Sequence, residues 1–346
     1  MKVFFMRKIL IISFLAGILG TFAACESSTE SGQHTLKTLP GADTIQIHLA
    51  IERLDSSLFA CSSREEVKHW LDTHPGFVNN YFPKNEFQDR NQLVTELHRR
   101  VNEPSLREFY KQAQESFQNF QPLQADLRTA FRNMKAYDPR FRTPRVQLVF
   151  TGFMGPDLMV SDSVLVIGID YFMGSKAKYR PDVYAYQLWR YTPQALVPQM
   201  LFIASEPYVK SDPKDRTLLA EMINYGKGYL FAQTMLPQTP DSLLIGYTGK
   251  QLAETEIAQD LVWGHFIDEK LLYETNPNKK IRYLGDRPQT PEIGPRCPGS
   301  IGRWLGWKIV RYYQDNNPDV SLKELMTNTN ARQILEASKY RGQTEQ

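Results

Sequence analysis

Histidine and carboxylate side chains are the groups in this 346-residue chain that could bind a metal or transfer a proton. The six histidines are His34, His48, His69, His74, His98 and His265. None stands in an HExxH or other zinc-ligand spacing, and only His265 lies in the C-terminal third of the chain. Because His265 lies among apolar residues in VWGHF, a structural role is favoured over a catalytic one. The histidines therefore indicate neither a metal site nor a catalytic base.

Two acidic residues could form an acid–base pair if the fold brought them together. Asp170 follows an apolar run, and Glu206 precedes a proline, but nothing in the sequence links them. Glu254, Glu256 and Asp260 recur at helical spacing, which is typical of a solvated helix face. The chain also has no GxSxG motif, no P-loop and no dinucleotide-binding glycine fingerprint. We therefore predict no catalytic residue, no metal ligand and no cofactor, and a protein that is not an enzyme.

The N-terminus carries the clearest functional signal. Lys2, Arg7 and Lys8 precede a run of apolar and small residues from 9 to 24, which is shorter than the roughly 20 residues of a membrane-spanning helix. The sequence FAAC at 22–25 resembles a bacterial lipobox, in which the cysteine receives a diacylglycerol and becomes the new N-terminus. We predict a signal peptide at 1–24, lipid attachment at Cys25 with a flexible tether to residue 43, and a globular domain at 44–342. The alternative is a soluble secreted protein with an incidental cysteine.

Charge and cysteine content limit the possible partners. The formal net charge of +3 falls to zero once the signal, with three basic and no acidic residues, is removed. A nucleic-acid partner would need a concentrated basic surface and is not expected. The lipid must then anchor the protein to the cell membrane or outer membrane, facing the periplasm. There Cys61 and Cys297 could pair or remain buried thiols, and the sequence leaves both possibilities open.

Hydrophobic periodicity predicts an α+β fold, mostly helical and in a single domain. Helical spacing runs from residue 64 to about 132 and again after residue 198, with a loop at 276–298. Two β-branched runs, at 146–150 and 164–169, flank a turn-rich connection. They predict an antiparallel hairpin and therefore a small antiparallel sheet.

The segment CPGSIGRWLGWKIVRYY, at 297–313, predicts a buried helix that begins after an N-capping Ser300. Gly302 and Gly306 are four residues apart, so they share a helix face that another helix can approach closely. We expect Trp304 and Trp307 to lie in the core, with an aromatic ligand platform as the alternative.

Several separated motifs resemble the gliding motility lipoprotein GldB family. They are the lipoprotein start, IERLD at 51–55, RYTP at 190–193, INYGK at 223–227 and CPGSIGRWLGWKIV at 297–310. The resemblance implies a role in surface gliding of Gram-negative bacteria that also use a dedicated secretion machine. We interpret the chain as a non-catalytic cell-envelope lipoprotein that acts by protein–protein interaction with this machinery. The alternatives are a metallopeptidase-like hydrolase with an unrecognised site and a solute-binding lipoprotein, and whether a small molecule binds stays open.

The C-terminal half also resembles a family of predicted zinc peptidases with HExxH on one helix and a glutamate ligand on the next. The matching first helix would be residues 195–205, which contain no histidine, and the glutamate position falls at Tyr225. The resemblance therefore implies a degenerate zincin-like scaffold, a pseudoenzyme without its metal.

Overall fold

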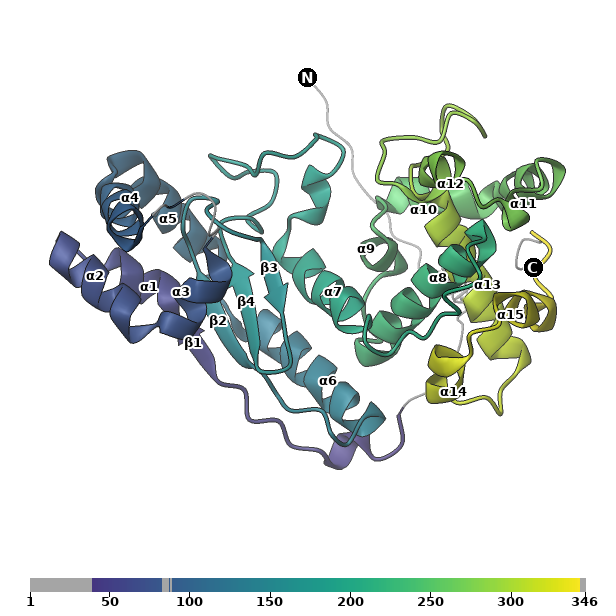
Figure 1. Ribbon diagram of the computed structural model, residues 1–346, viewed down its shortest axis with the longest axis horizontal. Helices are drawn as coiled ribbons and strands as arrows, with labels where there is room; N and C mark the ends of the chain where they lie inside the picture. Colours follow the sequence, from purple (N-terminus) through teal and green to yellow (C-terminus); the bar gives the residue numbers. More distant parts are fainter. Residues whose placement is uncertain (1–38, 83–86, 88, 343–346) are drawn as a thin grey trace, which may run out of the picture. The chain divides into compact units, whose positions relative to one another are not determined.

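A small mixed sheet lies at the centre of the N-terminal part of the domain (Figure 1). The computed structural model describes residues 39–82, 87 and 89–342. Within them the strands are β1 (Ile51–Arg53), β2 (Arg145–Val149), β3 (Leu158–Val160) and β4 (Val164–Gly168), in the order β1-β2-β4-β3. The last four residues of β2 and of β4 are buried, which explains their nearly continuous apolar sequences.

The predicted antiparallel hairpin between residues 146–150 and 164–169 is wrong. These two strands pair in parallel, with Val146 opposite Leu165 and Leu148 opposite Ile167. The connection that the sequence indicated as a turn contains β3, which forms the antiparallel partner of β4 through Met159 opposite Val166. Because the chain first crosses to the outer edge and then turns back, β4 runs in the same direction as β2. The small sheet is therefore mixed and not antiparallel.

The predicted helical period between residues 64 and 132 is confirmed. The helices are η1 (Ala42–Thr44), α1 (Leu54–Phe59), α2 (Arg64–Thr73), α3 (Pro75–Tyr81), α4 (Arg90–Asn102), α5 (Pro104–Ser116) and α6 (Gln121–Tyr137). In α2 the buried face is Val67, Trp70 and Leu71, and a capping box of Ser63 and Glu66 starts the helix. Pro75 and Pro104 stand at the first positions of α3 and α5, where the missing N–H of proline costs nothing.

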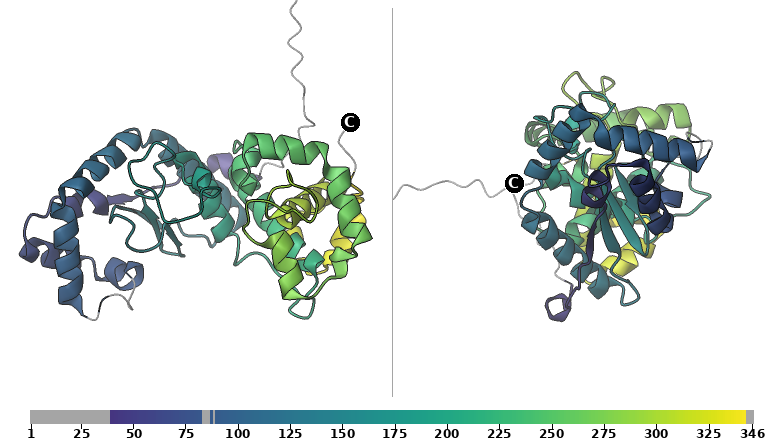
Figure 2. Two further views of the ribbon diagram at one scale, coloured as in Figure 1. Left: turned by 90° about the horizontal axis from the view of Figure 1, so that it is seen from above. Right: turned by 90° about the vertical axis from the view of Figure 1, so that its left-hand side faces the viewer.

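The C-terminal region is helical around a central pair. Its elements are η2 (Leu188–Arg190), α7 (Pro193–Ala204), α8 (Leu218–Met235), α9 (Asp241–Ile245), α10 (Gly249–Ile257), α11 (Gln259–Asp268), η3 (Leu271–Tyr273), α12 (Pro277–Leu284), α13 (Ile301–Asn316), α14 (Leu322–Thr327) and α15 (Ala331–Ser338). The pair is α8 and α13, and the other helices, green to yellow in Figure 2, gather around it. The loop predicted at 276–298 is partly wrong, because its first third forms α12.

The close helix crossing predicted for Gly302 and Gly306 is confirmed at Gly306, whereas Gly302 faces Tyr283 and Leu284 of α12. A Cβ placed on Gly306 would lie 1.9 Å from the backbone oxygen of Met222, and one on Gly226 would lie 2.3 Å from the oxygen of Gly306. The helices α8 and α13 therefore touch backbone to backbone. Trp304 and Trp307 are 1% and 0% exposed, which places both in the core and not on a ligand platform.

Ser300 occupies the N-cap position of α13 but does not cap it as predicted. Its backbone is left-handed, with φ of 57°, and its hydroxyl donates to the backbone oxygen of Gly285 at 2.9 Å. The side chain is thus used to fix the preceding loop against α12, and it accepts no hydrogen bond from the first turn of α13.

The described residues form one α+β domain, with Ala42 already buried at its start. The predicted signal peptide, Cys25 and most of the predicted tether lie outside the described residues. Cys61 is buried, Cys297 is half-buried, and both are free thiols. Among the described residues, no helix combines the length and the apolar character needed to cross a bilayer.

Candidate functional site

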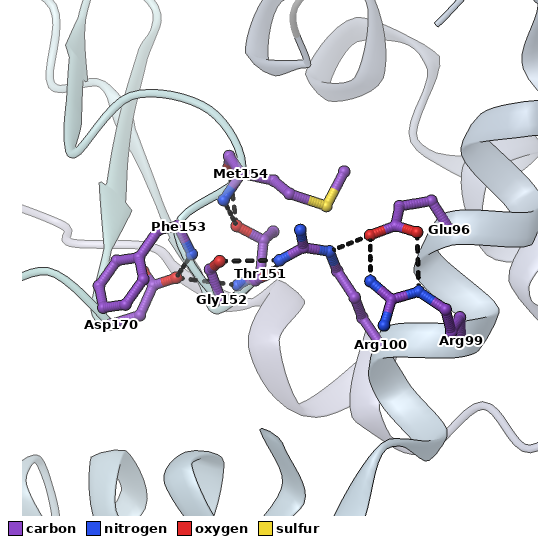
Figure 3. Close-up of polar contacts among 8 residues, drawn as sticks. All are labelled: Glu96, Arg99, Arg100, Thr151, Gly152, Phe153, Met154 and Asp170. Atoms are coloured by element: carbon purple, nitrogen blue, oxygen red, sulfur yellow. Dashed lines mark hydrogen bonds and ion pairs between the residues drawn. The ribbon is translucent and has the colours of Figure 1, made fainter. Parts of the chain in front are cut away.

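Asp170, the first candidate acid, lies buried directly after β4 (Figure 3). Its Oδ2 accepts hydrogen bonds from the backbone N–H groups of Thr151 at 3.2 Å and Phe153 at 2.7 Å. Both amides belong to the loop after β2, where Gly152 and Phe153 have φ of 68°. Burial raises the pKa of Asp170 to about 6, although the backbone hydrogen bonds oppose this shift. The carboxylate holds Phe153 in a left-handed conformation that a phenylalanine rarely adopts.

Arg100 of α4 holds the same loop through its backbone carbonyls (Figure 3). Its Nη1 donates to the oxygens of Thr151 at 3.1 Å and Gly152 at 2.8 Å, and its Nε donates to Glu96 at 2.6 Å. Glu96 also accepts two hydrogen bonds from Arg99, and these arginines lower its pKa. Because Asp170 binds the amides and Arg100 the carbonyls, the cluster fixes the backbone of the loop.

The proposed acid–base partner of Asp170 is not placed to act with it. Glu206 lies exposed just after the end of α7, whereas Asp170 is 1% exposed and faces the loop amides. No hydrogen bond joins the two within the part of the chain that the structure describes. Oδ2 of Asp170 therefore binds the loop backbone, while Oδ1 is buried without a hydrogen-bond partner among the described residues.

The sequence indicated that Glu254, Glu256 and Asp260 share one solvated helix face, but the structure places them in different surroundings. Glu254 pairs with Lys250 at 3.8 Å on the surface, and Asp260 is exposed in the first turn of α11. Glu256 instead accepts from the indole Nε1 of Trp304 at 3.2 Å and from the ammonium of Lys308 at 2.9 Å. Both donors belong to buried side chains of α13, and Glu256 provides the hydrogen-bond acceptor that they need.

His265, for which the sequence favoured a structural role, contacts a neighbouring helix. It is half-buried in α11, and its Nε2 lies 3.0 Å from the hydroxyl of Tyr283 on α12. This contact links two neighbouring helices.

The positions that resemble zinc ligands carry a different set of groups. The helix predicted at 195–205 is α7, and Tyr225 lies on α8. The guanidinium of Arg303 lies 4.4 Å from the centre of the Tyr225 ring, a cation–π contact. A fixed cation at this place disfavours a divalent metal. Within residues 39–82, 87 and 89–342, no group of three or more histidine, cysteine or acidic side chains is arranged to hold a metal ion.

A largely apolar groove that the sequence did not predict lies between the α10–α11 corner and the loop of residues 293–298. We call it the α10–α11 groove, and its volume is about 430 Å³. Ile257 and Leu261 line it and are 76% and 68% exposed. Arg296, also in the lining, is exposed, and its side chain makes no hydrogen bond or ion pair with any described residue. The sequence does contain a signal for this surface, because Ile257 and Leu261 are four residues apart and lie next to acidic residues. Hydrophobic periodicity alone, however, assigns such a pair to a buried helix face.

The chain matches a known protein family over most of its length. A family model described as Gliding motility protein GldB matches residues 36–342. No curated protein and no solved structure matches the chain.

Proposed function

The chain belongs to the gliding motility protein GldB family, and from this premise we propose that it supports motility by binding another cell-envelope protein, without catalysing a reaction. It is anchored through a lipid on Cys25 and faces the periplasm from the cell membrane or outer membrane. The membrane provides the location, and the folded domain provides the binding surface.

The observation that carries this proposal is the exposed apolar rim of the α10–α11 groove. Burying a side chain such as isoleucine or leucine contributes about 1.5–3 kcal/mol, and Ile257 and Leu261 leave most of this gain unused. Of the eight large hydrophobic side chains exposed in the described residues, five lie between residues 257 and 281. Exposed apolar surface of this kind is typical of a protein-binding site.

Charge indicates what the partner presents to the groove. The groove lining contains two charged residues, Glu254 and Arg296. Glu254 pairs with Lys250, whereas Arg296 is exposed and without a side-chain partner among the described residues. A partner that inserts an apolar side chain and carries a carboxylate beside it would satisfy both features. We therefore expect an envelope protein with an exposed apolar segment flanked by an acidic residue.

The candidate acids support the non-catalytic part of the proposal. Asp170 binds loop amides, and Glu256 binds Trp304 and Lys308. Oδ2 of Asp170 and both oxygens of Glu256 are thus engaged in contacts that hold the fold, which supports a structural role for these two acids.

The test replaces the native protein in cells with the double variant Ile257→Gln/Leu261→Gln. Both side chains are exposed, so the melting temperature and the amount of protein in the membrane fraction should stay unchanged while gliding is lost. Ile281→Gln is the matched control, because Ile281 is 60% exposed but lies on α12 and outside the groove lining. Arg296→Glu should also abolish gliding. Normal gliding of the double variant would refute the groove as the binding surface.

A further inference from the structure

A second cavity, of about 620 Å³, lies over the sheet between its strands and the α2–α3 junction. The polar side chains important here are Glu52 of β1, Gln147 and Arg145 of β2, and His74 between α2 and α3. None of them belongs to the α10–α11 groove, so this cavity is independent of the proposed docking function.

Strand pairing brings Glu52 and Gln147 together. They are register partners in the parallel pair β1–β2, so their side chains stand on the same face of the sheet. The amide Nε2 of Gln147 donates to Oε2 of Glu52 at 2.7 Å. Gln147 is only 5% exposed, and this contact directs the other carboxylate oxygen, Oε1, toward His74.

The hydrogen bonding of His74 determines which of its ring nitrogens carries a hydrogen. Nδ1 lies 2.7 Å from the backbone oxygen of Trp70, which can only accept, so Nδ1 is the donor. In the neutral ring Nε2 is then an acceptor, and it lies 3.6 Å from Oε1 of Glu52. This distance exceeds the usual 2.7–3.2 Å of a hydrogen bond. Two acceptors at such a spacing are satisfied together by a group with several N–H donors, and a primary ammonium is the simplest one.

A cationic side chain lies two residues away on the same strand. Arg145 is two residues before Gln147 on β2, so the two side chains project to the same face from Cα atoms about 7 Å apart. It is exposed, and its guanidinium makes no hydrogen bond or ion pair with any other described residue. The cavity therefore offers a carboxylate and an imidazole at one place and a free guanidinium about two residues away.

We propose that this cavity binds a small zwitterion of dipeptide size. Glu52 and His74 would receive the ammonium group, and Arg145 would receive the carboxylate. Two extended residues span roughly 7 Å, which matches the Cα spacing between Gln147 and Arg145, and the long, exposed Arg145 side chain can adjust its guanidinium to the carboxylate. The inference adds a solute site to a protein whose proposed function is protein binding.

The test measures calorimetric binding of L-alanyl-L-alanine to the full chain purified in detergent. Its N-acetylated form lacks the ammonium, and its C-terminal amide lacks the carboxylate. We expect one site per chain for the free dipeptide, with affinity at least tenfold weaker for each blocked form. Glu52→Gln and His74→Gln should each weaken binding of the free dipeptide at least tenfold. His69→Gln and Glu65→Gln, which change exposed side chains of α2 outside this cavity, should bind it normally.

Arg145→Gln keeps the proposal testable even if the other variants fold poorly, because Arg145 is exposed. In this variant the free dipeptide and its amide should bind equally. The proposal is overturned if no form binds at millimolar concentration, if the N-acetylated form binds as well as the free one, or if inorganic phosphate binds while the dipeptide does not.

Discussion

Replacing Gly306 by alanine tests the backbone contact between α8 and α13 directly. The added Cβ would lie 1.9 Å from the Met222 oxygen and 2.4 Å from its carbonyl carbon, whereas ordinary contact begins near 3.4 Å. The obstructing atoms are backbone, so no side chain can rotate away and the helices must separate by roughly 1.5 Å. Overpacking costs about 1–3 kcal/mol for flexible neighbours and more for rigid ones. The gain in helix propensity is at most about 1 kcal/mol. We expect Gly306→Ala to lower the free energy of unfolding by about 3 kcal/mol.

Thermal unfolding followed by circular dichroism measures this effect. A loss of this size in a domain of about 300 residues lowers the melting temperature by roughly 5 °C. Gly264→Ala is the matched control, because Gly264 also lies within a helix, α11, but has nothing within 4 Å of the added Cβ. It should raise the melting temperature slightly. If Gly306→Ala melts at or above the temperature of Gly264→Ala, the close-contact reasoning is refuted.

Four further outcomes are expected. Trp304→Ala should destabilise the domain by about 3–5 kcal/mol in denaturant titration, because it removes a side chain that is 1% exposed. Cys25→Ser should move the protein from the membrane fraction to soluble or unprocessed forms, and processed membrane-bound protein would contradict the lipid anchor. The purified chain should hold no stoichiometric zinc by elemental analysis, and a chelator should leave its melting temperature unchanged. Because the pKa of Asp170 is raised from 3.8 to about 6, the folded state binds its proton more tightly. The protonated Asp170 side chain therefore contributes fully to the free energy of unfolding below about pH 4. This contribution falls by about 3 kcal/mol as the pH rises through 6, so Asp170→Asn should flatten the pH dependence of stability.

Helices and buried residues of this domain could be predicted because their signals are local. The apolar period of α2 and α4 and the glycine spacing of α13 each lie within one element. The partner of Gly306 could not be predicted, because Gly226 lies 80 residues earlier and nothing in α13 encodes that distance. The prediction of the strand pairing failed for a similar reason. The three residues of β3 are hidden among turn residues, and without them the direction of β4 is assigned wrongly.

The polar cavity was not predicted because its residues are dispersed in the chain. Glu52, His74 and Gln147 come from two strands and a helix junction, and parallel pairing alone makes Glu52 and Gln147 neighbours. The roles of the candidate acids could not be predicted for a different reason. Glu256 has the spacing of a surface residue, but it accepts hydrogen bonds from the buried Trp304 and Lys308. Such a contact between helices far apart in the chain leaves no trace in the local sequence.

The parallel pairing of β1 with β2 has a consequence for how the domain folds. The strands β2, β3 and β4 lie within 24 residues, so they can form early, whereas β1 ends more than 90 residues before β2 begins. Closing a loop of that length costs about 4 kcal/mol of chain entropy before the three register pairs of β1 return any energy. The strand that comes first in the chain should therefore be the last to join the sheet. Until α1 to α6 have packed, one edge of β2 stays open to other extended chains.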